Sequence, residues 1–255
     1  MENSKIYLCV NYKSIDTLQK SIDRWRKNEP EIEIFVVDNY SDDLERLKVE
    51  SLSKECNFNL LISENIGYGA ALDLGLNHIL NSQYYSDESI VYFGNVDVYP
   101  TQPLRAEVST GIPMLNIYDT RRLKNVNPFL TKFQYLFFFL AKMAAKYKSK
   151  YLLLAWLAIQ KITSKIPSKP AAVHGALFCL NVGDLRTVCP IFNPNVFLYC
   201  EEMFFQQTLL LLNKPLIRSD NKFEHIGSVS TGSYFSNSSK RFENWCDSMA
   251  HLRES

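Results

Sequence analysis

The sequence lacks several features that would define common classes of protein. Its six cysteines include no C-x-x-C pair and mostly lie in apolar runs, which argues against a zinc site or a disulfide framework. Its longest apolar stretches, around Phe133–Tyr147 and Tyr151–Ile159, fall short of the roughly 18–20 residues that a membrane-spanning helix needs. The apolar run Ile6–Val10 is too short for a signal peptide. We therefore expect reduced cysteines and a cytoplasmic location.

Acidic residues are missing from one long segment. Between Thr120 and Gly183 there is no Asp or Glu, although this segment carries 11 Lys or Arg residues. Because the whole chain has a net charge of +1, the remainder carries −10. An ordinary solvated surface rarely separates charge in this way, so the segment needs its own explanation.

The composition excludes a largely disordered chain. Hydrophobic residues make up 46% and charged residues 22% of the 255 residues, as in folded globular proteins. A chain of this length can form one large domain with an appendage and can bury a substantial core.

Strand-like and helix-like segments alternate over the first hundred residues. The β-rich apolar runs cover residues 6–10, 32–37, 60–62 and 90–93. Helical patterns separate them at about residues 14–26, 42–53 and 66–80. This alternation predicts βαβ units, and hence an α/β fold with a mostly parallel central sheet flanked by helices. Ligands of such sheets bind beyond the carboxyl ends of the strands.

The rest of the chain also carries strand and helix patterns. Strands are predicted at 112–118, 176–181, 216–217 and 222–226. Helices are predicted at 201–212 and 244–252.

Polar side chains stand at the carboxyl ends of the predicted strands. They are Asn11, Tyr12, Asp38, Asn39, Asn65, Asn95 and Asp97. Asp38 is suited to hydrogen bonding a nucleobase or ribose, or it merely ends a strand before a helix that Ser41 caps. Asn95 and Asp97 lie two residues apart and can supply the oxygen ligands that Mg²⁺ or Mn²⁺ prefers.

Glycine is scarce, with nine residues, yet three glycines cluster at positions 67, 69 and 75 around the start of one predicted helix. Each glycine inside a helix costs roughly 1 kcal/mol relative to alanine, so the cluster needs a cause. Either the backbone approaches a ligand closely, or the helix packs tightly on the sheet. The spacing is neither a Walker A loop nor G-x-G-x-x-G.

Three ionisable residues late in the chain are candidates for catalysis. Glu201 and Glu202 open an apolar helix, where acidic residues either complement the helix dipole or provide a general base. A neighbouring carboxylate and burial would tune the pKa of such a base. His225 is either structural or a metal ligand.

Taken in order, these motifs resemble the inverting family-2 glycosyltransferases of the GT-A fold. The resemblance is strongest to the rhamnosyltransferase-like branch that builds bacterial O-antigen and capsule polysaccharides. The collinear segments that carry it are Val10–Ser14, Val37–Ser41, Asn65–Gly75, Asn95–Asp97, His174–Phe178, Phe197–Glu202 and His225–Ser230. The sequence departs from the family at Ala71 and Asp73, where Gly and Asn are usual, at Glu202, where Asp is usual, and by lacking an Arg within 206–211.

The resemblance implies a role for each motif. Asp97 and His225 would hold Mg²⁺ or Mn²⁺ against the diphosphate of a dTDP- or UDP-linked sugar donor. Glu202, or Glu201 in a shifted register, would be the base that deprotonates an acceptor hydroxyl. The residues implied to contact the donor are Asn11, Tyr12, Asp38, Asn65, Gly67, Asp73 and Asn95.

The resemblance, which does not extend to the basic segment or the tail, and the missing acidic residues together divide the chain into three regions. Residues 1–119 would form the nucleotide-sugar-binding half, 120–172 a basic helical insertion, and 173–255 the acceptor-binding half with a C-terminal helix. The lysines and aromatic residues of 129–165 fit an anionic membrane surface, so we expect peripheral attachment to the inner face of the cell membrane. An ordinary helical hairpin packed on the core is the alternative.

The expected partners are therefore a nucleotide-sugar donor, with rhamnose favoured, and a lipid-linked saccharide acceptor. UDP-linked hexoses or galactofuranose are alternative donors. No nucleic-acid motif accompanies the lysines, so no nucleic-acid partner is expected. A nucleotidyltransferase would need a Gly-rich loop after the first strand, which Asn11–Ser14 is not, whereas a non-catalytic, membrane-associated scaffold stays open.

Overall fold

The computed structural model describes residues 4–39, 42–107, 110–119, 124–125, 130–163, 166, 168–227 and 238–252. Tyr40, Ser41 and residues 228–230, which belong to two of the sequence motifs, lie outside this part. The strands are β1 Lys5–Asn11, β2 Glu33–Asn39, β3 Asn59–Ser63, β4 Ile90–Asn95, β5 Val98–Pro100, β6 Ile112–Asp119, β7 Lys124–Asn125, β8 Leu130–Thr131, β9 Pro170–Ala172, β10 Leu177–Asn181 and β11 Leu216–His225. The helices are α1 Ile15–Asn28, α2 Asp43–Cys56, α3 Tyr68–Leu80, α4 Lys132–Tyr135, α5 Phe138–Lys146, α6 Lys150–Thr163, α7 Val182–Val188, α8 Glu201–Leu212 and α10 Ser238–Ala250.

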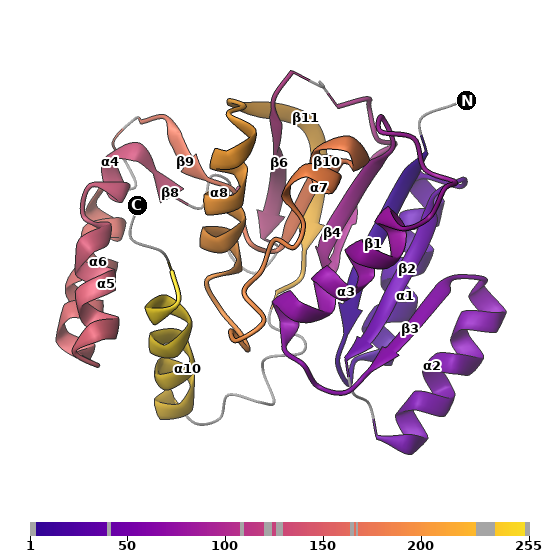
Figure 1. Ribbon diagram of the computed structural model, residues 1–255, viewed down its shortest axis with the longest axis horizontal. Coiled ribbons are helices and arrows are strands. Elements are labelled where there is room, and N and C mark those ends of the chain that lie inside the picture. Colours follow the sequence, from indigo (N-terminus) through magenta and orange to yellow (C-terminus); the bar gives the residue numbers. More distant parts are fainter. Residues whose placement is uncertain are drawn as a thin grey trace.

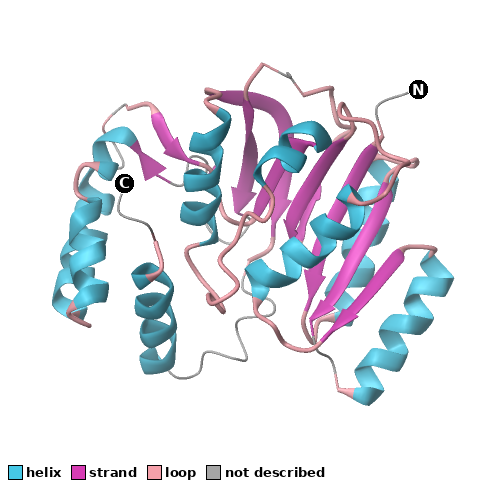
Figure 2. Cartoon of the chain, viewed as in Figure 1, coloured by secondary structure: helices cyan, strands magenta, loops and turns pink. Residues whose placement is uncertain are grey.

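A five-stranded sheet of order β10-β4-β1-β2-β3 forms the centre of the molecule (Figure 1). Strands β4, β1, β2 and β3 are parallel, and β10 pairs with β4 in the antiparallel sense. The mostly parallel α/β sheet predicted from the sequence is confirmed. The strand order changes direction at β1, and the arrowheads of the parallel strands end at the same edge (Figure 2). Ligands of open α/β sheets bind at that edge, beside such a reversal.

A second sheet of order β5-β11-β6-β7 lies beside the first. The sequence predicted two short strands at 216–217 and 222–226, but the structure has the single strand β11. Its pairing with β6 shifts register between Arg218 and Lys222, and this irregularity divides the apolar pattern into two pieces.

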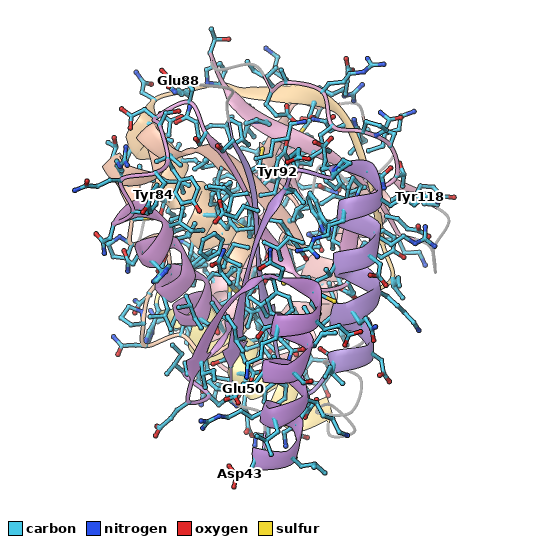
Figure 3. All side chains as sticks on the ribbon, turned by 90° about the vertical axis from the view of Figure 1, so that its right-hand side faces the viewer. Asp43, Glu50, Tyr84, Glu88, Tyr92 and Tyr118 are labelled. Atoms are coloured by element: carbon cyan, nitrogen blue, oxygen red, sulfur yellow. The ribbon has the colours of Figure 1, made fainter. Side chains whose placement is uncertain are left out.

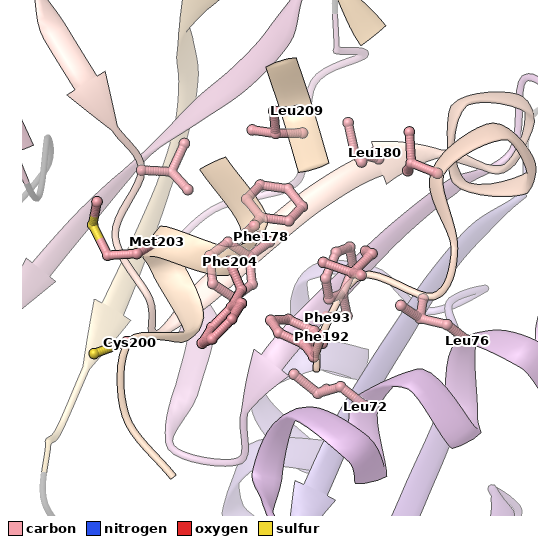
Figure 4. Packing of buried hydrophobic residues seen from close by; sticks show 14 of the residues in the cluster. Leu72, Leu76, Phe93, Phe178, Leu180, Phe192, Cys200, Met203, Phe204 and Leu209 are labelled. Atoms are coloured by element: carbon pink, nitrogen blue, oxygen red, sulfur yellow. The ribbon is translucent and has the colours of Figure 1, made fainter. Parts of the chain in front are cut away.

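Alternate residues of each central strand face two separate cores. On β1, Ile6, Leu8 and Val10 face α3, α7 and α8, whereas Tyr7 and Cys9 face α1 and the second sheet. Both faces of the sheet are therefore covered, as a parallel sheet requires. In the first core, aromatic side chains such as Phe93, Phe178 and Phe192 gather between the sheet and the helices (Figure 4).

The sequence pattern placed the helices that it predicted but not all of their ends, and it missed α7 at Val182–Val188. Helix α2 begins with Asp42 as N-cap, whose side chain accepts a hydrogen bond from the Glu45 N–H at 3.1 Å, in place of the predicted Ser41. The C-terminal helix α10 begins at Ser238, six residues before its predicted start.

Tyrosine side chains lie both inside the protein and on its surface. Tyr92 on β4 lies in the interior, whereas Tyr84 and Tyr118 lie at the periphery (Figure 3).

The predicted basic insertion forms α4, α5 and α6 with the short strands β8 and β9, at the left of Figure 1. Its first predicted helical stripe is interrupted at Leu136 and Phe137, between α4 and α5. Helix α5 packs against both α6 and α10. None of the helices in the described ranges is long and apolar enough to cross a membrane.

Candidate active site

Two polar residues meet where β1 and β2 end. The Asn11 side-chain amide donates a 2.7 Å hydrogen bond to Asp38 Oδ1, and the Ser14 hydroxyl donates to Asn11 Oδ1 at 3.0 Å. Asn11 and Asp38 are almost fully buried. Buried polar groups are stabilised by such pairing, so this network holds the Asp38 carboxylate at the carboxyl edge of the sheet. Tyr12 follows directly and is half-buried.

A second network joins β2 to the loop before α3. The Asn39 amide donates to Asn65 Oδ1 at 3.3 Å, and Asn39 Oδ1 accepts from the Ile66 N–H at 3.0 Å. The sequence indicated Asn39 only as a strand-end residue, whereas the structure makes it the group that positions Asn65. Its position next to Asp38 at a strand end was the available signal.

The three clustered glycines are explained by contacts within the protein. Gly67 has φ +91, and a Cβ there would lie 2.7 Å from the Phe197 carbonyl oxygen. A Cβ on Gly69 would meet the Phe192 side chain, and one on Gly75 would meet Leu8 and Val37 of the sheet. Tight packing thus accounts for the cluster, and a contact between Gly67 and the donor stays a prediction.

Asp73 has a structural role, and its predicted contact with the nucleotide stays a prediction. Its two carboxylate oxygens accept hydrogen bonds from the Ile191 and Phe192 N–H groups, at 2.9 and 2.8 Å. The side chain is 7% exposed, and burial raises its pKa to about 6 against the lowering effect of these two bonds. Asp73 therefore fastens α3 to the loop that leads toward α8.

Asp97 and His225 come together from distant parts of the chain. Asp97 Oδ1 lies 3.5 Å from His225 Nε2, and both side chains are largely buried. The Asp97 carbonyl accepts the Ile226 N–H at 3.2 Å, which holds the end of β11 beside the β4–β5 turn. A carboxylate and an imidazole suit a divalent cation such as Mn²⁺ or Mg²⁺. Asn95 ends β4 next to this pair and is half-buried.

The residues present fit part of a metal coordination shell. Among the described residues there is no group of three or more His, Cys, Asp or Glu side chains that could hold an ion. Asp97 and His225 alone would leave most positions around a cation open, so a bound diphosphate or water would have to fill them. Such an open shell suits a cation that arrives with its substrate.

His174 connects this pair to the start of α8. Its ring lies edge-on to the His225 ring, with centroids 5.8 Å apart, and its Nδ1 accepts the Ala176 N–H at 3.1 Å. The next residue, Gly175, lies directly against Glu202, because a Cβ there would be 2.6 Å from Glu202 Oε2. The sequence marked His174 only as part of a motif, not as a site residue.

The backbone turn before α8 determines where the side chains of Glu201 and Glu202 lie. Tyr199 and Cys200 both adopt left-handed backbone conformations, with φ +79 and +67, which non-glycine residues rarely do. Such conformations are kept where the surrounding structure enforces them, often at functional sites. Glu201 Oε1 accepts the Tyr199 N–H at 2.7 Å, so Glu201 is engaged within the turn, whereas Glu202 faces Gly175.

Both glutamates have raised pKa values. Burial raises the pKa of Glu201 to about 7, partly offset by hydrogen bonds from backbone N–H groups. Burial, followed by the charge of Glu201, raises the pKa of Glu202 to about 7. A carboxylate with a pKa near neutrality can accept a proton efficiently at physiological pH. The environment therefore suits a general base at this position.

A cavity of about 980 Å³ lies at the opposite end of the sheet from these residues. Lys5, Glu33 and Ile90, near the amino ends of β1, β2 and β4, contribute to its lining. It is separate from the carboxyl edge where the site residues gather.

Comparison with solved structures identifies the fold. S. aureus TarS matches with a TM-score of 0.58 and 13% identity over 88% of this chain and 37% of that chain. The mannosyltransferase PcManGT from Pyrobaculum calidifontis, in complex with GDP-Man and Mn²⁺, gives 0.50 and 15% over 87% of this chain and 56% of that chain. Glucosyl-3-phosphoglycerate synthase from Mycobacterium tuberculosis, in complex with Mn²⁺, UDP and glucosyl-3-phosphoglycerate, gives 0.51 and 14% over 100% of this chain and 82% of that chain.

These similarities show a GT-A glycosyltransferase fold. The chain spans well under two thirds of the length of TarS and of PcManGT. No protein-family model and no curated protein sequence matches the chain.

Proposed function

We propose that this protein is an inverting glycosyltransferase that moves a sugar from a nucleotide-diphosphate donor to a hydroxyl of a lipid-linked saccharide. Rhamnose from its dTDP donor is favoured by the sequence resemblance, and a UDP-linked hexose or galactofuranose is the alternative. The product would belong to a bacterial surface polysaccharide such as O-antigen or capsule.

One observation carries the proposal: Glu202 and the Asp97–His225 pair converge at the carboxyl edge of a GT-A sheet. Glu202 lies against Gly175, whose neighbour His174 lies edge-on to His225. Single displacement with inversion requires a base on one side of the sugar and a stabilised leaving group on the other. These two groups supply both requirements within one site.

In this reaction Glu202 accepts the proton of the acceptor hydroxyl as its oxygen attacks the anomeric carbon. The bond from that carbon to the diphosphate breaks on the opposite face, which inverts the configuration. We assign the base to Glu202 because the Glu201 carboxylate is already engaged by the Tyr199 N–H. A divalent cation held by Asp97 and His225 would supply positive charge beside the departing diphosphate.

The nucleoside would lie beside the networks at the ends of β1, β2 and β3. Asp38 and Asn65 are held there by Asn11 and Asn39, so their polar atoms are fixed before the donor binds. Such preorganisation lowers the entropy cost of binding. Tyr12 and Asn95 flank this position at the ends of β1 and β4.

The insertion would bring the enzyme to the membrane that carries the acceptor. On α6 the exposed positions are Tyr151, Leu154, Ala155, Leu157, Ala158 and Ile162, with Lys150 and Lys161 as the charged ones. Leu136, Phe139 and Tyr147 add exposed apolar area on and beside α5. An apolar helix face bordered by lysines, with no acidic residue in the segment, suits the interface of an anionic bilayer. We therefore propose a peripheral position on the inner face of the cell membrane.

Calorimetric titration of UDP and dTDP, with and without Mn²⁺, tests the proposed function. We expect one nucleotide to bind only when Mn²⁺ is present, and Asp97→Ala to lose that binding by at least about tenfold, because a charged ligand and its cation are removed. The matched control is Asp43→Ala, which removes an exposed carboxylate from the first turn of α2.

Each outcome of the titration has a consequence. Metal-dependent binding that Asp43→Ala keeps and Asp97→Ala loses would support the transferase. Binding of neither nucleotide by the wild type would contradict it and favour a non-catalytic, membrane-associated scaffold. Binding without turnover on any lipid-linked acceptor would favour the same scaffold.

A further inference from the structure

Tyr68 opens α3 at a point where two parts of the site are joined. Its N–H donates a 3.0 Å hydrogen bond to the Phe197 carbonyl, and the preceding Gly67 lies against the same carbonyl. Phe197 belongs to the segment that leads through Tyr199 and Cys200 into α8. The backbone of Tyr68 is therefore fixed between the nucleotide side of the site and the helix that carries Glu202.

The Tyr68 hydroxyl is buried and has no hydrogen-bond partner in the part of the chain that the structure describes. A buried hydroxyl without a partner is destabilising, so folded proteins rarely keep one without a reason. Phenylalanine would fill nearly the same space without this penalty. The hydroxyl is therefore better explained by a ligand that binds it than by packing.

The surroundings of this hydroxyl show which part of the site it faces. Burial, then the charges of Glu201 and Asp97, raise the pKa of the Tyr68 phenol well above its usual value. The phenol is consequently protonated at every working pH and can donate a hydrogen bond. It therefore lies close enough to the candidate metal ligand Asp97 and to Glu201, at the start of α8, to be affected by both charges.

Resting on the proposed function, we propose that the Tyr68 hydroxyl donates a hydrogen bond to an oxygen of the transferred sugar. The diphosphate would lie at Asp97 and His225, and the acceptor hydroxyl at Glu202. The sugar must occupy the space between the diphosphate and the acceptor, because its anomeric carbon loses its bond to the diphosphate and forms a bond to the acceptor oxygen. Tyr68 is thus a specificity-determining residue that distinguishes a nucleotide sugar from the free nucleotide.

The variant Tyr68→Phe removes only this hydroxyl. The test titrates wild type and variant with UDP and dTDP, and with dTDP-rhamnose, UDP-glucose and UDP-galactofuranose, all with Mn²⁺. For the donor that wild type prefers, we expect the affinity of the nucleotide sugar relative to its free nucleotide to fall about fivefold to tenfold, as for one lost hydrogen bond. Affinity for the free nucleotide stays the same, and the melting temperature does not fall.

Tyr85→Phe is the matched control, because the Tyr85 phenol is largely buried and interacts with Glu33 at the amino end of β2. We expect it to lower the melting temperature and to leave the affinity ratio unchanged, the reverse of Tyr68→Phe. An unchanged ratio in Tyr68→Phe would overturn the inference, and so would an equal loss of affinity for nucleotide and nucleotide sugar. Failure of wild type to bind any nucleotide would instead overturn the proposed function.

Discussion

Helices α1 and α6 have the same length of 14 residues, yet they meet solvent in opposite ways. The exposed positions of α1 are all polar or charged: Asp16, Gln19, Lys20, Asp23, Arg24 and Lys27. Its apolar residues Leu18, Ile22 and Trp25 are fully buried. On α6 only Trp156 and Thr163 are buried, and most exposed positions are apolar.

This difference separates a region whose apolar side chains are covered within the protein from one that leaves apolar side chains exposed. A helix on the surface of a soluble protein buries its apolar stripe and exposes its polar face, as α1 does. Helix α6 leaves Tyr151 87% and Ile162 72% exposed, which is costly in water. We infer that the region around the central sheet carries the chemistry and that the insertion α5–α6 carries attachment to a surface. Variants that impair sugar transfer should therefore leave attachment to the surface unchanged, and variants that impair attachment should leave transfer unchanged.

The largest expected effect is that of Glu202→Gln on turnover. Glutamine keeps the size of the side chain but cannot accept the proton, so the transfer rate should fall by about 10²–10⁴-fold. Donor binding and vesicle binding should be unchanged. The measurement is product formation from the labelled donor, with Glu55→Gln at an exposed position of α2 as control. Turnover at the wild-type rate would remove Glu202 from the mechanism and return attention to Glu201.

Variants of the insertion should lose vesicle binding and keep nucleotide binding. Leu154→Glu combined with Leu157→Glu places two negative charges on the exposed face of α6, and should weaken binding to vesicles of anionic phospholipid by tenfold or more. Vesicle sedimentation measures the change, and nucleotide binding should stay at its wild-type value. The control is Leu44→Glu with Leu47→Glu on α2, where both leucines are similarly exposed.

Removal of 133–159 gives a coarser version of the same test. Vesicle binding that persists after this deletion, or after the α6 double variant, would mean that the exposed apolar face has another partner.

The pH dependence should reflect the environment of Glu202. Because its pKa is about 7, kcat/KM should rise about tenfold per pH unit below that value and level off above it. Glu201→Gln removes the neighbouring charge, so the profile should move to lower pH. A profile that does not move in this variant would show that another group titrates.

The same pKa shift also affects stability. The folded state keeps the Glu202 proton from its ordinary value of 4.5 up to about 7, whereas the unfolded chain releases it. The free energy of unfolding should therefore fall as the pH rises through this window, and Glu202→Gln should flatten the fall. Urea titrations between pH 4 and 8 measure it.

The smallest effect concerns the connection between α3 and the loop before α8. Asp73→Asn leaves one acceptor oxygen for two N–H donors, so the free energy of unfolding should fall by about 1–3 kcal/mol. The exposed Asp43→Asn should change it by less than about 0.5 kcal/mol. Equal stability of the two variants in urea would show that this tie is dispensable.

Much of this arrangement is predictable from local sequence. Continuous apolar, β-rich runs gave the central strands, and the polar residues that follow them gave Asn11, Asp38, Asn65 and Asp97 at one edge. The start of α8 at Glu201 was also predicted, because its apolar run follows two acidic residues.

Other features depend on contacts between distant residues and were not predictable. No residue next to Gly67 in the sequence indicates that its backbone lies against that of Phe197. Likewise, no residue next to Asp73 indicates that its carboxylate binds the N–H groups of Ile191 and Phe192. The predicted stripe is interrupted by the break between α4 and α5, and α6 and α10 cover only part of it. Phe137 and Leu140 pack inward, whereas Leu136 and Tyr147 stay exposed.

The three tryptophans are distributed over the same two regions, the central-sheet region and the insertion with its neighbour α10, so their fluorescence can tell these regions apart. Trp25 is fully buried in α1, where its indole N–H donates to the Val98 carbonyl. Trp156 on α6 lies edge-on to Phe138, and Trp245 on α10 stacks on Phe242, both beside or within the insertion. Lipids that carry a fluorescence quencher should therefore dim the emission of Trp156 and Trp245 and leave that of Trp25 constant. The unlabelled protein can thus report whether the insertion lies at a bilayer, as proposed.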